Sequence, residues 1–187
     1  MARPPHARER VLDAFEALLI SDGERAATLD AVARAAGVSK GGLLYHFGSK
    51  DDLAAAMIAR LDRLGAEDVE RIRSAAEGPV EYYLRTSVMM DDALDRAIIA
   101  ATRLAQGGST AATDALHRMR EDSAEVIRPH VQDQAALDLV MLLSDGLFFN
   151  NTLDADGSDG VVPAGAALEA LIALVSSATR PRRSRDR

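Results

Sequence analysis

Residues 28–53, TLDAVARAAGVSKGGLLYHFGSKDDL, decide the fold of this chain. Thr28 and Ser39 are residue types that begin helices, because their side chains accept a hydrogen bond from the first backbone turn. Gly37 suits the left-handed backbone that closes a helix, and Ser49 again precedes a helix start. The stretch therefore predicts a short helix, a tight turn and a second short helix, followed directly by a third.

The chain has only two lysines, Lys40 and Lys50, and each follows one of the predicted N-cap serines. Both ammonium groups therefore fall in the first turn of a helix, where the helix dipole disfavours a cation. This placement harms the local structure unless an anion compensates from outside. DNA phosphate is the leading candidate for that anion.

The spacing is typical of a helix-turn-helix, whose second helix enters the major groove of DNA. Two consecutive glycines in that helix cost up to ~1 kcal/mol each relative to Ala, a cost that close approach of DNA to the backbone would explain. Lys40 suits guanine or phosphate, Leu44 suits a thymine methyl, and Tyr45 and His46 suit phosphate oxygens. An ordinary three-helix packing unit is the alternative. The predicted DNA-facing positions of the helix are Lys40, Gly41, Gly42, Leu44, Tyr45 and His46.

Composition excludes several classes of protein. The chain has 187 residues, of which 48% are apolar, and it has no cysteine, so disulfides and thiolate metal sites are excluded. No apolar run approaches the ~18 residues of a membrane span, and no secretory segment opens the chain. We therefore expect a cytoplasmic protein that does not enter a membrane.

Charge is distributed unevenly along the chain. The formal net charge is −7, but residues 1–50 sum to +1, residues 61–179 to −11 and residues 180–187 to +4. An acidic body would orient the molecule on DNA with the head forward. The weakly basic head predicts modest non-specific affinity.

Apolar residues recur at helical spacing along the whole chain, and strand signals are almost absent. The predicted fold is all-α, with about nine helices: a three-helix head containing the helix-turn-helix, and a body of about six helices. The expected helices cover residues 8–21, 28–36, 39–47, 51–74, 80–90, 91–106, 110–128, 132–153 and 163–178.

The head resembles the DNA-binding domain of the TetR family of bacterial transcriptional regulators. The residues that carry the resemblance are Thr28, Ala36-Gly37-Val38-Ser39, Tyr45-His46-Phe47, Ser49-Lys50 and Leu53, within a similar region of about residues 8–60. Leu44 stands where many members of the family carry a second aromatic residue. The body shares only the helical layout of the family.

The resemblance implies a homodimeric repressor that binds a near-palindromic operator in double-stranded DNA and is released by a small-molecule effector. It implies a DNA-binding domain at 1–52, a ligand-binding and dimerisation domain at 53–179, and dimerisation through the two C-terminal helices. We expect the Arg-rich segment 180–187 to be disordered. By analogy, Thr28, Lys40, Gly41, Tyr45, His46 and Lys50 contact DNA, and we add Ser39.

A ligand pocket in the body would use aromatic, Met and a few polar side chains, which suit a small and largely apolar molecule. Each of these residues is more often plain core than ligand contact. His117 with Asp114 and Glu121 could hold a metal, but surface ion pairing is the more common outcome of this spacing. We expect no cofactor. The ligand candidates are Tyr82, Tyr83, Met89, Met90, Arg103, Met119, Asp145, Phe148 and Asn151.

Two other functions compete with a regulator: an all-helical enzyme or small-molecule carrier, and a helical interaction module that never meets DNA. Against an enzyme, the sequence shows no pairing of nucleophile and base, no metal-ligand spacing and no glycine-rich phosphate loop. We therefore predict a DNA-binding regulator and not an enzyme.

Overall fold

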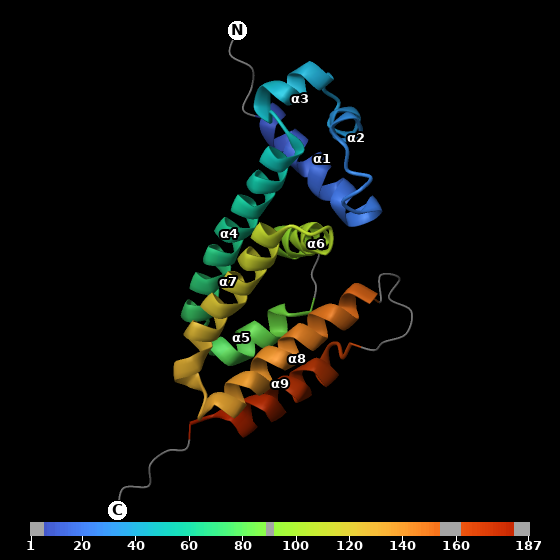
Figure 1. Ribbon diagram of the computed structural model, residues 1–187. Helices are drawn as coiled ribbons and strands as arrows, with labels where there is room; N and C mark the ends of the chain where they lie inside the picture. Colours follow the sequence, from blue (N-terminus) through green and yellow to red (C-terminus); the bar gives the residue numbers. More distant parts are fainter. Residues whose placement is uncertain (1–5, 89–91, 154–161, 182–187) are drawn as a thin grey trace, which may run out of the picture. The chain divides into compact units, whose positions relative to one another are not determined.

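The computed structural model describes residues 6–88, 92–153 and 162–181. Over these residues the secondary structure consists of nine α-helices and one 3-10 helix, with no strand (Figure 1). The predicted all-α fold, a helix-turn-helix head with a helical body, is confirmed. The elements are α1 (His6–Asp22), α2 (Leu29–Ala35), α3 (Lys40–His46), α4 (Lys50–Ser74), α5 (Pro79–Thr86), α6 (Ala93–Gln106), α7 (Thr110–Ile127), η1 (Arg128–His130), α8 (Gln134–Leu153) and α9 (Ala166–Thr179).

The described chain forms two compact units. The first contains residues 6–65 and 92–119, and the second contains residues 66–88, 120–153 and 162–181. Because α4 and α7 are long, each contributes to both units. These units are defined by how the helices pack, whereas the proposed domains are defined by function. The proposed boundary between residues 52 and 53 therefore stays a prediction. Residues 182–187 of the predicted tail lie outside the described residues.

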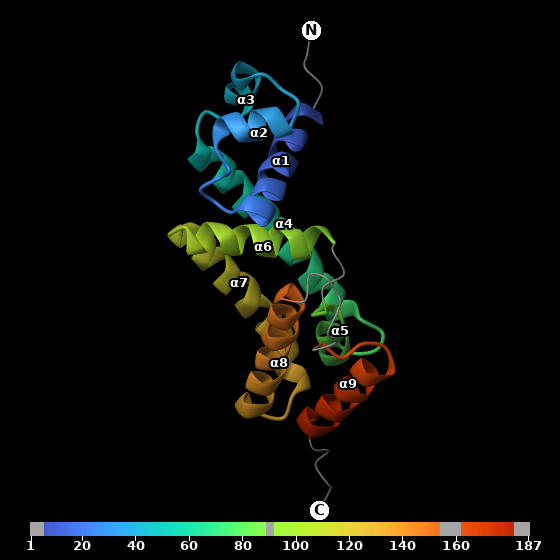
Figure 2. The same cartoon turned by 90° about the vertical axis from the view of Figure 1, so that its right-hand side faces the viewer.

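Side-chain caps begin the helices of the head as predicted. Thr28 Oγ1 accepts the N–H of Ala31 at 3.2 Å, and Ser39 Oγ accepts the N–H of Gly42 at 3.1 Å. Ser49 Oγ accepts the N–H of Asp52 at 3.1 Å. Each bond satisfies an N–H that the start of a helix leaves free. These three local bonds set where α2, α3 and α4 begin (Figure 2).

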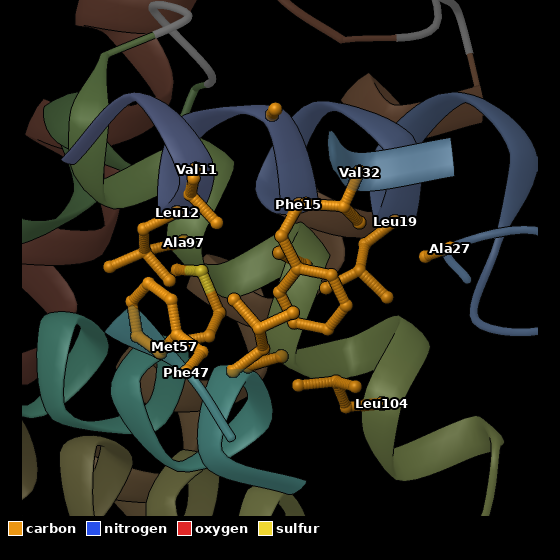
Figure 3. Packing of buried hydrophobic residues seen from close by; sticks show 14 of the residues in the cluster. Val11, Leu12, Phe15, Leu19, Ala27, Val32, Phe47, Met57, Ala97 and Leu104 are labelled. Carbon is orange, nitrogen blue, oxygen red and sulfur yellow. The ribbon is translucent and has the colours of Figure 1, made fainter. Parts of the chain in front are cut away.

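The core of the first unit joins the head to α6 and α7. Phe15 and Leu19 of α1 are fully buried and lie among Met57 of α4, Ala97 and Leu104 of α6, and residues of α2 and α3 (Figure 3). Burying a side chain as large as Phe or Leu contributes about 1.5–3 kcal/mol. The alanine-rich face of α6 lets this helix pack closely on α1. The head and α6 therefore share one core.

A cluster of charges on α1 and α4 reinforces this core. The Arg60 guanidinium contacts Glu9 at 3.0 Å, Asp13 at 2.8 Å and Glu16 at 2.8 Å, with 13% of its side chain exposed. Glu16, which is itself buried, also accepts from Arg96 of α6 at 3.3 Å. Burial lowers the pKa of Arg60, but hydrogen bonds to Glu16 and Asp13 raise it, and the net change is an increase. Three helices are thus held by one network of ion pairs.

The second unit has its own apolar core. It is made by α5, α8 and α9 with the ends of α4 and α7, and α5 packs against both α8 and α9. Gln132 N–H donates to the carbonyl of Thr179 at 2.8 Å, which joins the start of α8 to the end of α9. The most deeply buried side chains are Ile72, Val80, Leu84, Ile127, Leu137, Val140, Met141 and Ile172.

One predicted helix start is wrong. We expected Pro163 to open the last helix, but α9 begins at Ala166 with Gly165 as its N-cap. Gly165 has a φ of 53°, in the left-handed region, so a right-handed helix cannot run through it from Pro163. Among the described residues, no helix is both long and apolar enough to cross a bilayer.

Candidate nucleic-acid interface

The turn between α2 and α3 is closed by backbone hydrogen bonds. Gly37 has a φ of 66°, and the N–H of Val38 donates to the carbonyl of Ala33 at 3.0 Å. This pairing is the C-terminal cap that a left-handed glycine permits. It turns the chain sharply, so that α3 follows α2 at once and both helices pack on α1.

α3 has a buried face and an exposed face. Leu43 and Phe47 are 0% and 3% exposed and anchor the helix in the core of the head. Leu44 is 40% exposed and Tyr45 is 76% exposed, so the face of α3 opposite its buried residues carries two large exposed side chains. Gly41 is also exposed, and a Cβ added there would meet nothing within 4 Å. The outer surface of α3 is thus free to receive a partner.

Two predicted positions on α3 are less accessible. Gly42 is buried, so the structure separates the two glycines, although both were expected near DNA. His46 is half-buried, and its Nε2 is buried with no hydrogen-bond partner among the described residues. Its ring meets that of Tyr45 edge-on, with centroids 5.2 Å apart. Tyr45 therefore offers the more accessible polar group at this end of α3.

Both lysines have an acidic partner inside the head, which the sequence analysis did not identify. Lys40 Nζ lies 3.1 Å from each carboxylate oxygen of Asp30. Lys50 Nζ lies 2.6 Å from the Glu24 carboxylate and 2.6 Å from the Glu24 backbone carbonyl. Helix starts alone could not reveal these partners, which come from ten and 26 residues earlier in the chain. The lysines alone therefore do not demonstrate an external polyanion.

Thr28 and Ser39 carry exposed hydroxyl groups at the starts of α2 and α3. Each hydroxyl accepts a backbone hydrogen bond within its own cap. A hydroxyl that accepts such a bond keeps its own proton to donate. Both residues can therefore cap a helix and still donate to a phosphate oxygen.

Arg8 is a residue of this surface that the sequence did not single out. Its guanidinium carbon lies 4.9 Å from the centroid of the Phe47 ring, which is a cation–π distance. The contact joins the first turns of α1 to the residue that ends α3. Because the two residues are 39 positions apart, no local spacing could predict it.

The residues proposed for a ligand fall in both units. Tyr82, Tyr83, Asp145, Phe148 and Asn151 lie in the second unit, whereas Arg103 and Met119 lie in the first. Arg103 lines a recess of 560 Å³ formed by the ends of α1 and α6 and the turn after α1. Met89 and Met90 lie outside the described residues.

Tyr83 belongs to a polar cluster inside the second unit. Its side chain hydrogen-bonds to that of Ser144, whose hydroxyl lies 2.7 Å from that of Ser87. Burial and the nearby Asp145 carboxylate raise the pKa of Tyr83 to about 12, against the hydrogen bond from Ser144 and the charge of Arg120. Asp145 itself pairs with Arg120 at 3.0 Å. The structure thus brings together two predicted ligand residues, Tyr83 and Asp145.

The sequence of the head is similar to that of known regulatory proteins. Residues 11–57 match the model of "Bacterial regulatory proteins, tetR family". The HTH-type transcriptional regulator SrpR of Pseudomonas putida is 36% identical over 58 residues, which are 31% of this chain and 27% of SrpR. The matched segment spans less than half of the length of the curated relatives.

Solved structures share the whole fold. A SmeT–triclosan complex aligns with a TM-score of 0.68 at 16% identity, over 94% of this chain and 92% of SmeT. The multidrug binding protein EbrR complexed with malachite green aligns with a TM-score of 0.65 at 19% identity, over 94% of this chain and 99% of EbrR. The helix-turn-helix segment thus matches the TetR family of bacterial regulatory proteins, and the described helices have the fold of these solved structures.

Proposed function

We propose that this protein is a homodimeric transcriptional repressor that binds a near-palindromic operator and is released by a small, largely apolar ligand. The observation that carries the proposal is the outer face of α3, exposed at Leu44 and Tyr45 on a helix-turn-helix of the TetR type. A repressor of chromosomal genes acts beside the chromosome, so we propose a cytoplasmic location.

DNA contact is proposed through α3. Its N-terminal residues Lys40 and Gly41 would meet base edges, and Leu44 would meet a thymine methyl. The Tyr45 hydroxyl would donate to a phosphate oxygen. Supporting contacts to the backbone complete the proposed set, namely those of Thr28, Ser39, His46 and Lys50.

Dimerisation is proposed through α8 and α9. Leu142 and Phe149 of α8 are 65% and 59% exposed, and Leu174 of α9 is 67% exposed. Large apolar side chains exposed on two helices that pack against each other suit a surface that a partner covers. A second copy of the chain suits this surface, because a near-palindrome is read by a two-fold protein with half-sites ~34 Å apart.

Most of the residues proposed to bind the effector belong to the second unit. SmeT and EbrR have each been solved with a small organic molecule bound. In this chain, Tyr82 and Phe148 would provide apolar contacts, while Tyr83, Asp145 and Asn151 would provide polar ones. We retain Met89, Met90, Arg103 and Met119 as further candidates. The uncharged phenol of Tyr83 would donate to a polar group of the ligand.

The test is fluorescence anisotropy with the DNA upstream of the protein's own gene and with a scrambled duplex, at several salt concentrations. We expect preference for the upstream duplex and a log–log salt slope of about −0.9 for each phosphate neutralised. Tyr45→Ala should weaken binding to both duplexes, and Tyr45→Phe should show the part that depends on the hydroxyl. If the protein binds DNA independently of salt, or does not bind DNA, the result would favour an all-helical enzyme or carrier, or an interaction module, over a regulator.

The effector is tested by a thermal-shift screen of small organic molecules. A compound that raises the melting temperature should also dissociate the protein–DNA complex in the anisotropy assay. If the stabilising compounds all leave the complex intact, release by a ligand is wrong.

A further inference from the structure

Each lysine of the chain is held by an acid of the head. Lys40 of α3 contacts both oxygens of Asp30, which lies in the first turn of α2. Lys50 of α4 contacts the carboxylate and the backbone carbonyl of Glu24. A protein that binds DNA through the phosphates alone would gain by leaving such cations free. The acids therefore reduce the non-specific attraction of the head for DNA.

The two pairs differ in how readily they open. The side chains of Lys40 and Asp30 are 57% and 68% exposed, and an ion pair this exposed is screened by water. Lys50 and Glu24 are each only 31% exposed, and the carbonyl adds a second bond. Lys40 is therefore the lysine whose partner is easily exchanged, and Asp30 decides what it binds.

Asp30 distinguishes two kinds of acceptor on DNA. An ammonium group has three N–H donors, and the two oxygens of Asp30 occupy at most two of them. The third can donate to the neutral O6 or N7 of guanine without bringing a second negative charge near Asp30. A phosphate at the same place would be repelled by the carboxylate. The pair thus favours contact with bases over contact with phosphates.

Building on the function proposed above, we infer that Asp30 is a specificity-determining residue, which directs Lys40 away from DNA phosphates and toward base edges. Glu24 holds Lys50 more tightly, through its carboxylate and its backbone carbonyl, so Asp30 is the acid whose partner is more easily exchanged. The weak net charge of residues 1–50, +1, agrees with a head that is built to bind random DNA poorly.

The experiment compares Asp30→Asn with Asp51→Asn. Asp51 is an exposed acid in the first turn of α4 that forms no ion pair among the described residues, so both variants remove one negative charge near a helix start. On scrambled duplex, Asp30→Asn should steepen the log–log salt slope by about 0.9, which is about eightfold tighter binding at about 0.1 M salt. Affinity for the upstream duplex should rise less, so the ratio of specific to non-specific affinity falls.

A second variant shows whether the effect passes through Lys40. In Asp30→Asn/Lys40→Gln the gain on scrambled duplex should disappear, and thermal melting checks that each variant is folded. If the wild type prefers the upstream duplex, two results would refute this inference and leave the proposed function intact. One is an equal gain in affinity for scrambled duplex from Asp30→Asn and Asp51→Asn, and the other is an unchanged salt slope in Asp30→Asn. A wild type that binds neither duplex refutes the proposed function and this inference together.

Discussion

Gly41→Ala should change stability and DNA affinity in opposite directions. Gly41 is the second residue of α3, has no positive φ, and leaves open space where a Cβ would stand. Alanine is therefore compatible with the fold and favours the helix by up to ~1 kcal/mol, less near its first turn. A gain of about 0.5 kcal/mol raises the melting temperature by about 1–2 °C in a chain of this size.

The methyl group would at the same time stand where DNA closely approaches the backbone. We expect at least about a tenfold loss of affinity for the upstream duplex, which corresponds to about 1.4 kcal/mol. Calorimetry measures the stability and anisotropy measures the affinity. Gly146→Ala is the control for stability, because Gly146 lies in α8 with nothing within 4 Å of its added Cβ. It should gain a similar stability, and because α8 belongs to the proposed dimer surface this variant is compared by calorimetry alone. Undiminished DNA binding by Gly41→Ala would refute the close approach.

Three further results are expected. Arg60→Ala should lower the free energy of unfolding in urea by about 2–4 kcal/mol, because the buried Glu16 loses its closer partner. Arg118→Ala breaks one exposed ion pair and should lower it by less than about 1 kcal/mol. Equal losses in the two variants would contradict the role of burial. Burial raises the pKa of Tyr83 to about 12 in the folded state, above the usual 10. Its contribution to folding stability is therefore complete below pH 10 and is lost as the pH rises to about 12. Tyr83→Phe should remove the last step of a tyrosinate absorbance titration, and a variant whose titration keeps that step would show that Tyr83 titrates normally. Leu142→Glu should yield monomers in sedimentation, and a persistent dimer would exclude this face of α8.

The parts of the fold that depend on near neighbours could be predicted from the sequence. Thr28, Ser39 and Ser49 begin helices through bonds to residues three positions later, and Gly37 ends one through its own backbone. The buried face of α3 follows from helical spacing, which places Leu43 and Phe47 together. Local rules of this kind located the candidate site.

Contacts between distant residues could not be predicted in this way. The partner of Lys50 is 26 residues away, and that of Arg8 is 39. The sequence also does not show that Gly42 is buried while Gly41 is exposed, because two adjacent glycines look alike without their neighbours. The acidic partners of Lys40 and Lys50 are likewise distant in the sequence, and the proposed DNA contact rests on the exposed face of α3.

The shared core of α1 and α6 has a consequence for protein engineering. The recognisable DNA-binding segment ends at residue 57, but Phe15 and Leu19 bury themselves partly against a helix that begins at Ala93. A chimaera made by cutting after the recognisable segment would expose this apolar face of α1 to solvent and would be prone to aggregate. A DNA-binding head transferred to another ligand-binding domain should therefore keep residues 92–119.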